Sequence, residues 1–153
     1  MFRPFTFSVL CLASLSVVLS ATAAEDESAA DLKKMAGDWV PHLVQVNGKK
    51  QPDEFAAAIK LTIIGNKYNT VVGPEKDEGT LKLDATKSPR EMDIISNVGA
   101  AKGKTIPCIY EIKEDELRVC YGLKGARPAD LKAGENEKEI VMLIAYKRAA
   151  KKE

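Results

Sequence analysis

Residues 103–122, GKTIPCIYEIKEDELRVCYG, constrain the fold more than any other segment of this chain. Apolar residues occupy every second position on both arms of the segment, and the charged pair Glu114 and Asp115 separates the arms. Alternation with a period of two is typical of a strand with one buried and one solvated face. The segment therefore predicts a β-hairpin.

Strand patterning recurs along the rest of the chain. Eight segments carry it: residues 39–46, 60–64, 67–72, 80–83, 92–96, 104–112, 117–121 and 139–146. Turn residues such as Asn47-Gly48 and Gly65-Asn66 separate them. Closely spaced strands without crossover helices favour an antiparallel barrel or sandwich. Pro52 and Asp53 open a short helical segment, and a second helical turn is expected before Trp39.

Residues 1–24 have the organisation of a secretory signal peptide. Arg3 precedes an apolar run from Phe5 to Leu19, which is shorter than the ~20 residues needed to span a bilayer. Small residues before the predicted cleavage site fit cleavage after Ala23 or Ala24. The leader predicts an exported protein, periplasmic or secreted, with no membrane span after cleavage; an uncleaved membrane anchor is the alternative.

The mature chain is expected to be one domain. Residues 25–31 are acidic and small, which predicts a disordered lead-in; residues 32–149 form the domain, and residues 150–153 a basic tail. All 22 acidic residues follow the leader, and losing Arg3 lowers the 23 basic residues to 22, so the mature net charge is 22 − 22 = 0. A neutral chain does not attract polyanions, so we expect no nucleic-acid partner. A monomer is expected.

Short motifs along the mature chain resemble those of a known family. The chain carries, in order, GDW at residues 37–39, then VNGKKQP, LDATKSPREMDI, GKTIPCIYEI, DELRVC, RPADLKA and a terminal YKR. Their order and spacing resemble a lipocalin-like domain common in secreted planctomycete proteins, a family of unknown function. The resemblance spans nearly the whole mature chain and implies an all-β, eight-stranded, antiparallel up-and-down barrel. Cys108 stands where the family usually has Gly, and Leu131 where it more often has an aromatic residue.

The resemblance also implies how one end of the barrel closes. In lipocalin-like barrels, a Gly-x-Trp near the start of the first strand fills the barrel bottom, and a basic residue of the last strand packs over the indole. These roles fall here on Gly37, Trp39 and Arg148. The residue types fit, because Gly allows close backbone approach and a guanidinium can stack on an indole face.

His42 is the only histidine of the chain. Alternation along the first predicted strand places it with Val40, Val44 and Val46 on the apolar face, pointing into a barrel. One imidazole without an ordered set of Cys, Asp or Glu partners makes a poor metal site. A hydrogen-bonded core histidine is the favoured interpretation, with a ligand contact and a metal ligand or general base as alternatives.

Cys108 and Cys120 remain after the leader is removed, and an even count in an exported protein favours a disulfide. Strand register argues against it. Across a two-residue turn, Cys108 lies opposite Tyr121 and Cys120 opposite Ile109, so the thiols point to opposite faces and cannot be bridged. A three-residue turn or bulge would set them directly opposite, and both outcomes remain open. No neighbouring His or basic cluster suggests a reactive thiol pair.

The sequence shows no combination of acid, base, nucleophile and metal ligands that would suggest catalysis. Acidic residues cluster at the hairpin tip, where charge serves solubility, and the chain has no P-loop, no Gly-x-Ser-x-Gly and no His-Glu-x-x-His. We expect no enzyme activity, no cofactor and no metal. The leading hypothesis is an exported binding module for a small apolar or amphipathic ligand. Its candidate ligand contacts are His42, Val44, Val46, Tyr110, Ile112, Val119, Tyr121 and Met142.

The alternative hypothesis is a cell-envelope protein-interaction or inhibitor domain. In that case side chains fill the barrel, no small molecule binds, and an envelope protein partner docks on the rim through the loops at residues 99–103 and 122–137.

Overall fold

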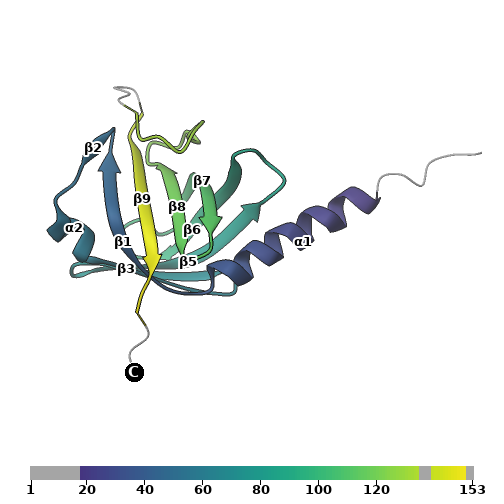
Figure 1. Ribbon diagram of the computed structural model, residues 1–153, viewed down its shortest axis with the longest axis horizontal. Coiled ribbons are helices and arrows are strands. Elements are labelled where there is room, and N and C mark those ends of the chain that lie inside the picture. The colour runs from purple at the N-terminus through teal and green to yellow at the C-terminus, as the bar shows by residue number, and fades with distance from the viewer. Residues whose placement is uncertain (1–17, 135–138, 151–153) are drawn as a thin grey trace, which may run out of the picture.

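The computed structural model describes residues 18–134 and 139–150. Nine antiparallel strands follow one another in a single sheet: β1 Gly37–Val46, β2 Lys49–Lys50, β3 Ile59–Ile64, β4 Lys67–Val72, β5 Glu75–Asp84, β6 Arg90–Val98, β7 Thr105–Lys113, β8 Glu116–Gly122 and β9 Val141–Arg148. Strand β2 pairs only with β1, and β1 also pairs with β9, which closes the sheet. The predicted fold class, an eight-stranded antiparallel up-and-down barrel, is confirmed (Figure 1).

The β7–β8 hairpin has the register of a two-residue turn. Ile112 lies opposite Leu117, and Glu114 at the turn has a φ of 46°. Cys108 therefore pairs with Tyr121, and Cys120 lies opposite Ile109 across the same ladder. Both cysteines are free and buried, so the structure holds no disulfide between them.

Hydrophobic side chains form two clusters that explain this separation. The larger cluster lines the barrel interior and includes Cys108, while the smaller one lies outside the barrel wall and includes Cys120. Ala133, in the segment after β8, is buried in the outer cluster, and Leu131 packs against it. Leu131 and Ala133 therefore cover the outer face of β9, where Val141 and Leu143 belong to the same cluster.

A bulge in β1 changes which side chains face inward. The ladder with β9 shifts between Pro41 and Leu43, so Trp39 and Val44 are both buried although they are an odd number of residues apart. His42 sits at the shift and is exposed to solvent. The expectation that His42 points into the barrel is wrong, because simple alternation does not hold across a bulge.

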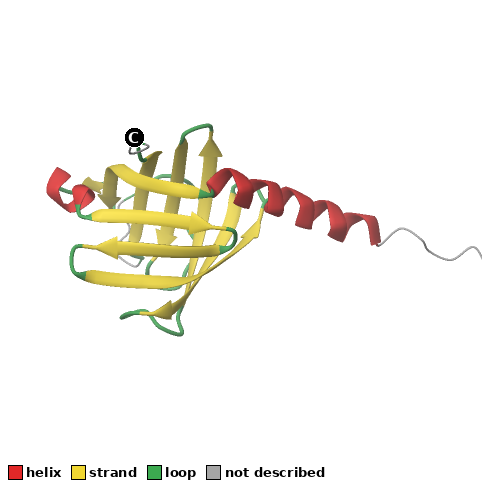
Figure 2. Cartoon of the chain, turned by 90° about the horizontal axis from the view of Figure 1, so that it is seen from below, coloured by secondary structure: helices red, strands yellow, loops and turns green. Residues whose placement is uncertain are grey.

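Two helices flank the barrel at different places. Helix α1, Val18–Met35, leads into β1 and extends away from the barrel, whereas the short α2, Asp53–Ala57, lies between β2 and β3 (Figures 1 and 2). The short helix after Pro52 is confirmed. Neither helix of the described residues has the length and hydropathy of a membrane span.

Helix α1 replaces the disordered lead-in expected for residues 25–31. Its alanines favour helix, and its C-terminal half is anchored to the barrel. Ser28 Oγ donates a hydrogen bond to the Leu83 carbonyl (3.3 Å) and accepts one from the Ala85 N–H (3.2 Å). Most of the predicted leader, residues 1–17, and most of the predicted basic tail, residues 151–153, lie outside the described residues.

Candidate ligand-binding site

One end of the barrel is closed by an indole and a guanidinium. Trp39 is buried, and its Nε1 donates a hydrogen bond to the Met35 carbonyl (2.8 Å) at the end of α1. The Arg148 guanidinium stacks 4.4 Å from the centre of the Trp39 ring, and its Nη1 donates to the Ala36 carbonyl (3.0 Å). These contacts tie α1, β1 and β9 together at this end.

Gly37 provides the space that this arrangement requires. Its φ is 127°, a conformation that side chains disfavour. A Cβ at this position would lie 3.2 Å from Arg148 Nη1. The structure thus brings Gly37, Trp39 and Arg148 together at the closed end.

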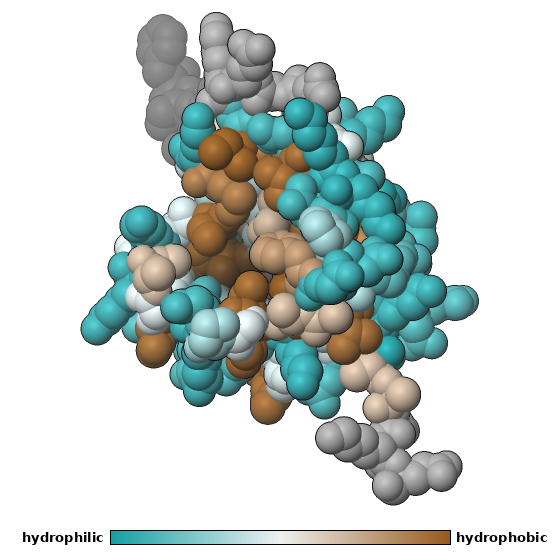
Figure 3. Space-filling model, turned by 90° about the vertical axis from the view of Figure 1, so that its left-hand side faces the viewer, coloured by the Kyte–Doolittle hydropathy of each residue, from teal (hydrophilic) through white to brown (hydrophobic). Residues whose placement is uncertain are grey.

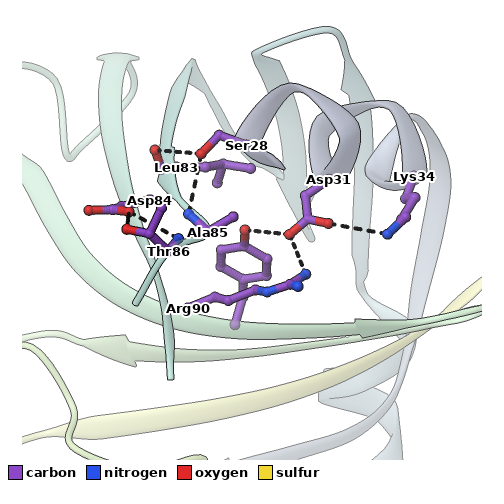
Figure 4. A network of polar contacts seen from close by, with 9 residues as sticks. Ser28, Asp31, Lys34, Leu83, Asp84, Ala85, Thr86 and Arg90 are labelled. Atoms are coloured by element: carbon purple, nitrogen blue, oxygen red, sulfur yellow. Dashed lines mark hydrogen bonds and ion pairs between the residues drawn. The ribbon is translucent and has the colours of Figure 1, made fainter. Parts of the chain in front are cut away.

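A buried carboxylate fastens α1 beside the same end (Figure 4). The Asp31 side chain is only 3% exposed; its Oδ2 accepts hydrogen bonds from Tyr110 Oη (2.8 Å) and Arg90 Nη1 (2.6 Å). Lys34 Nζ lies 3.5 Å from the other carboxylate oxygen. Burial and the hydrogen bond to Asp31 raise the pKa of Tyr110 well above its usual value, so this phenol stays protonated.

The barrel interior holds a cavity of about 200 Å³. Phe55 of α2 and Leu123 after β8 lie at its mouth, where they are 40% and 43% exposed. On the face shown in Figure 3, apolar side chains line a hollow bordered by polar residues. The walls are mainly apolar and comprise Met35, Phe55, Ile59, Leu61, Ile63, Tyr68, Thr70, Val72, Asp77, Leu81, Met92, Ile94, Ile106, Leu117, Val119, Tyr121, Leu123, Met142, Ile144 and Tyr146.

Two phenols meet on the cavity wall. Tyr121 Oη and Tyr146 Oη are 2.9 Å apart, and either can donate to the other. Burial raises the pKa of both phenols well above the usual value, so both stay protonated. Only one of the two protons is used in their mutual hydrogen bond, which leaves one O–H donor available beside the cavity.

A second polar group on the wall involves β4, β5 and β6. Tyr68 Oη donates a hydrogen bond to Asp77 Oδ2 (2.9 Å), and the Ser96 hydroxyl contacts Asp77 Oδ1. Gly79 makes this packing possible, since a Cβ there would lie 2.8 Å from the Tyr68 ring and 2.0 Å from the Ile95 carbonyl oxygen. Burial, followed by the hydrogen bond and charge of Asp77, raises the pKa of Tyr68.

A depression of about 750 Å³ lies at the β7–β8 turn, but its chemistry is that of a solvated surface. Its lining residues are charged, and they pair with one another, as in Lys113 Nζ with Glu111 Oε1 (2.9 Å) and Arg148 Nε with Asp115 Oδ1 (3.0 Å). Exposed ion pairs of this kind contribute little specificity or stability. The apolar cavity inside the barrel is the better candidate site.

The structure brings three of the eight predicted ligand contacts to this cavity: Val119, Tyr121 and Met142. Val44 packs in the interior core without lining the cavity, and Val46 is half-buried near the end of β1. Tyr110 bonds to Asp31, and Ile112 lies beside the β7–β8 turn. His42, exposed at the bulge, is outside the cavity.

Several lining residues were missed from the sequence for different reasons. Tyr68 and Met92 belong to predicted strands and could have been found by tracing alternation inward. Tyr146 ends the predicted strand 139–146, in which residues 140–146 are all apolar, so alternation could not show which of its side chains face inward. Asp77 lies in the charged segment 75–79, which gave no strand signal, although it forms the first half of β5.

The surroundings of Cys108 and Cys120 do not activate either thiol as a nucleophile. Burial raises the pKa of Cys108 well above its usual value and that of Cys120 to about 11. Among the described residues, no group of three or more His, Cys, Asp or Glu side chains is placed to hold a metal ion. The interior combines apolar walls with a few polar groups, a composition common in small-molecule pockets.

Comparison of this chain with protein-family models, with curated proteins and with solved structures finds no match.

Proposed function

We propose that this protein is an exported, lipocalin-like binding module that holds a small apolar or amphipathic molecule inside its barrel. The observation that carries the proposal is the apolar cavity of about 200 Å³ with an exposed mouth. A barrel of eight strands is just wide enough for packed side chains or for one small ligand. Space left beside well-packed interior side chains favours the ligand over the filled barrel.

The cavity volume limits the size of the ligand. An apolar protein cavity of roughly 150 Å³ is large enough for benzene. A cavity of about 200 Å³ therefore suits one ring, or an equally short aliphatic chain, with one small substituent. For a ligand of this size we expect dissociation constants on the order of micromolar to millimolar.

Benzyl alcohol is a suitable neutral probe, because it combines one ring with one hydroxyl. Saturation-transfer NMR should detect saturable binding of benzyl alcohol to the wild-type protein. Val119→Phe should abolish this binding by filling the cavity, since Val119 is buried and lines its wall. Overpacking costs about 1–3 kcal/mol, so thermal unfolding must show that the variant is folded.

Val40→Phe is the matched control, because Val40 is 40% exposed and lies outside the cavity. This variant should bind benzyl alcohol as the wild type does. Absence of saturable binding to the wild type, or equal binding to folded Val119→Phe, would contradict the proposed function. Export is tested separately: protein recovered from its native host should begin at Ala24 or Glu25.

A further inference from the structure

Asp77 is the only charged residue that lines the cavity in the described part of the chain. It lies on β5 four residues before the buried Leu81, so strand alternation points its side chain to the same, inward face. Directly across the ladder is Thr70, another lining residue. The cavity wall thus carries one acidic group and no Lys, Arg or His.

The Asp77 carboxylate accepts hydrogen bonds but has no counter-ion among the described residues. Its partners, Tyr68 and Ser96, are neutral hydroxyl donors. The neighbouring Lys76 pairs instead with Glu78, and none of the ion pairs among the described residues includes Asp77. A carboxylate has about four acceptor positions, so two remain for a further donor.

The surroundings make an opposite charge favourable at this position. Asp77 is half-buried, so its carboxylate is partly removed from water, and its attraction for a cation strengthens as the local dielectric falls. The Tyr68 ring beside it adds an aromatic surface that attracts cations. Binding of an anionic ligand would be disfavoured, because repulsion by Asp77 adds to the cost of removing the ligand's charge from water.

We infer that the ligand is a small amphipathic cation, with a protonated amine that pairs with Asp77 and an apolar body of about one ring that fills the cavity. This inference rests on the proposed function and specifies the ligand class for the same site. The spare donor of the Tyr121–Tyr146 pair can accommodate one further acceptor on the ligand.

Three probes of nearly equal size test the inference: benzylamine, benzyl alcohol and benzoate. At neutral pH they are cationic, neutral and anionic. We expect benzylamine to bind about tenfold more tightly than benzyl alcohol, in line with the usual gain from a charge-assisted hydrogen bond, and benzoate to bind most weakly. Asp77→Asn should remove the advantage of benzylamine and leave benzyl alcohol binding nearly unchanged.

Glu78→Gln is the matched control, because it removes the same charge from the adjacent position on β5, outside the cavity lining. It should keep the wild-type order of affinities. Equal or weaker binding of benzylamine than of benzyl alcohol by the wild type would overturn the inference while the proposed function stands. An unchanged order in folded Asp77→Asn would also overturn it, and if Asp77→Asn does not fold, the wild-type order decides. Failure of all three probes to bind would overturn both.

Discussion

Asp31→Ala should destabilise the whole domain, although Asp31 lies in a segment whose sequence suggests disorder. The substitution removes the acceptor for the Tyr110 hydroxyl, and Tyr110 is only 1% exposed. A buried donor left without a partner costs about 1–3 kcal/mol. The Arg90 side chain is 41% exposed and regains water, so its lost ion pair adds at most about 1 kcal/mol. We therefore expect a loss of about 1–4 kcal/mol in the free energy of unfolding.

Urea unfolding followed by the fluorescence of Trp39 measures this loss, because Trp39 is the only tryptophan and is buried where α1 meets the barrel. Tyr110→Phe serves as the second arm of a double-mutant cycle. Once Tyr110 has lost its hydroxyl, Asp31→Ala no longer leaves an unpaired donor, so the double variant should be about 1–2 kcal/mol more stable than additivity predicts.

Two results would contradict this prediction. One is unfolding of Asp31→Ala within about 0.5 kcal/mol of the wild type, a change ordinary for exposed positions. The other is additivity of the two substitutions. Either result would mean that α1 is not fastened to the barrel through Asp31.

Three further predictions follow from the packing. Gly37→Ala should lower stability by about 1–3 kcal/mol in urea unfolding, because the added methyl must fit beside Arg148 with a φ of 127°; an unchanged midpoint would refute the closure geometry. All four tyrosines have raised pKa values, so the folded state keeps phenolic protons that the unfolded state releases at high pH. The free energy of unfolding should therefore be unaffected by the tyrosines below about pH 10 and fall as the pH rises further, and phenolate absorbance should appear together with unfolding. Phenolate absorbance that appears near pH 10 in the folded protein would contradict this. Cys108 and Cys120 should resist thiol reagents in the native state and both react in unreduced denaturant, whereas the absence of thiols there would show that they are bonded.

The barrel was predictable from the sequence because strand alternation and turn residues agree along most of the chain. The register of the β7–β8 hairpin followed from a single assumption about its turn, and that assumption also separated the two cysteines. Local patterns of this kind depend on neighbours along the chain and across one ladder.

The features that sequence patterns missed depend on tertiary contacts. The bulge at His42 reverses the inward face of β1 without leaving a composition signal. Helix α1 is anchored by Ser28 and Asp31 to groups more than fifty residues away in sequence. Asp77 was missed because charged residues dominate the start of β5, and its role follows from strands that the fold brings beside it.

The methionines report most directly on whether the barrel interior accepts a small molecule. Met35, Met92 and Met142 all line the cavity, and Met1 is the only other methionine of the chain. With isotopically labelled methionine methyl groups, assigned by Met→Leu variants, titration with benzylamine should shift all three cavity signals along one saturable curve. In folded Val119→Phe the same signals should not move. Three signals that stay fixed in the wild type up to millimolar benzylamine and benzyl alcohol would contradict the account.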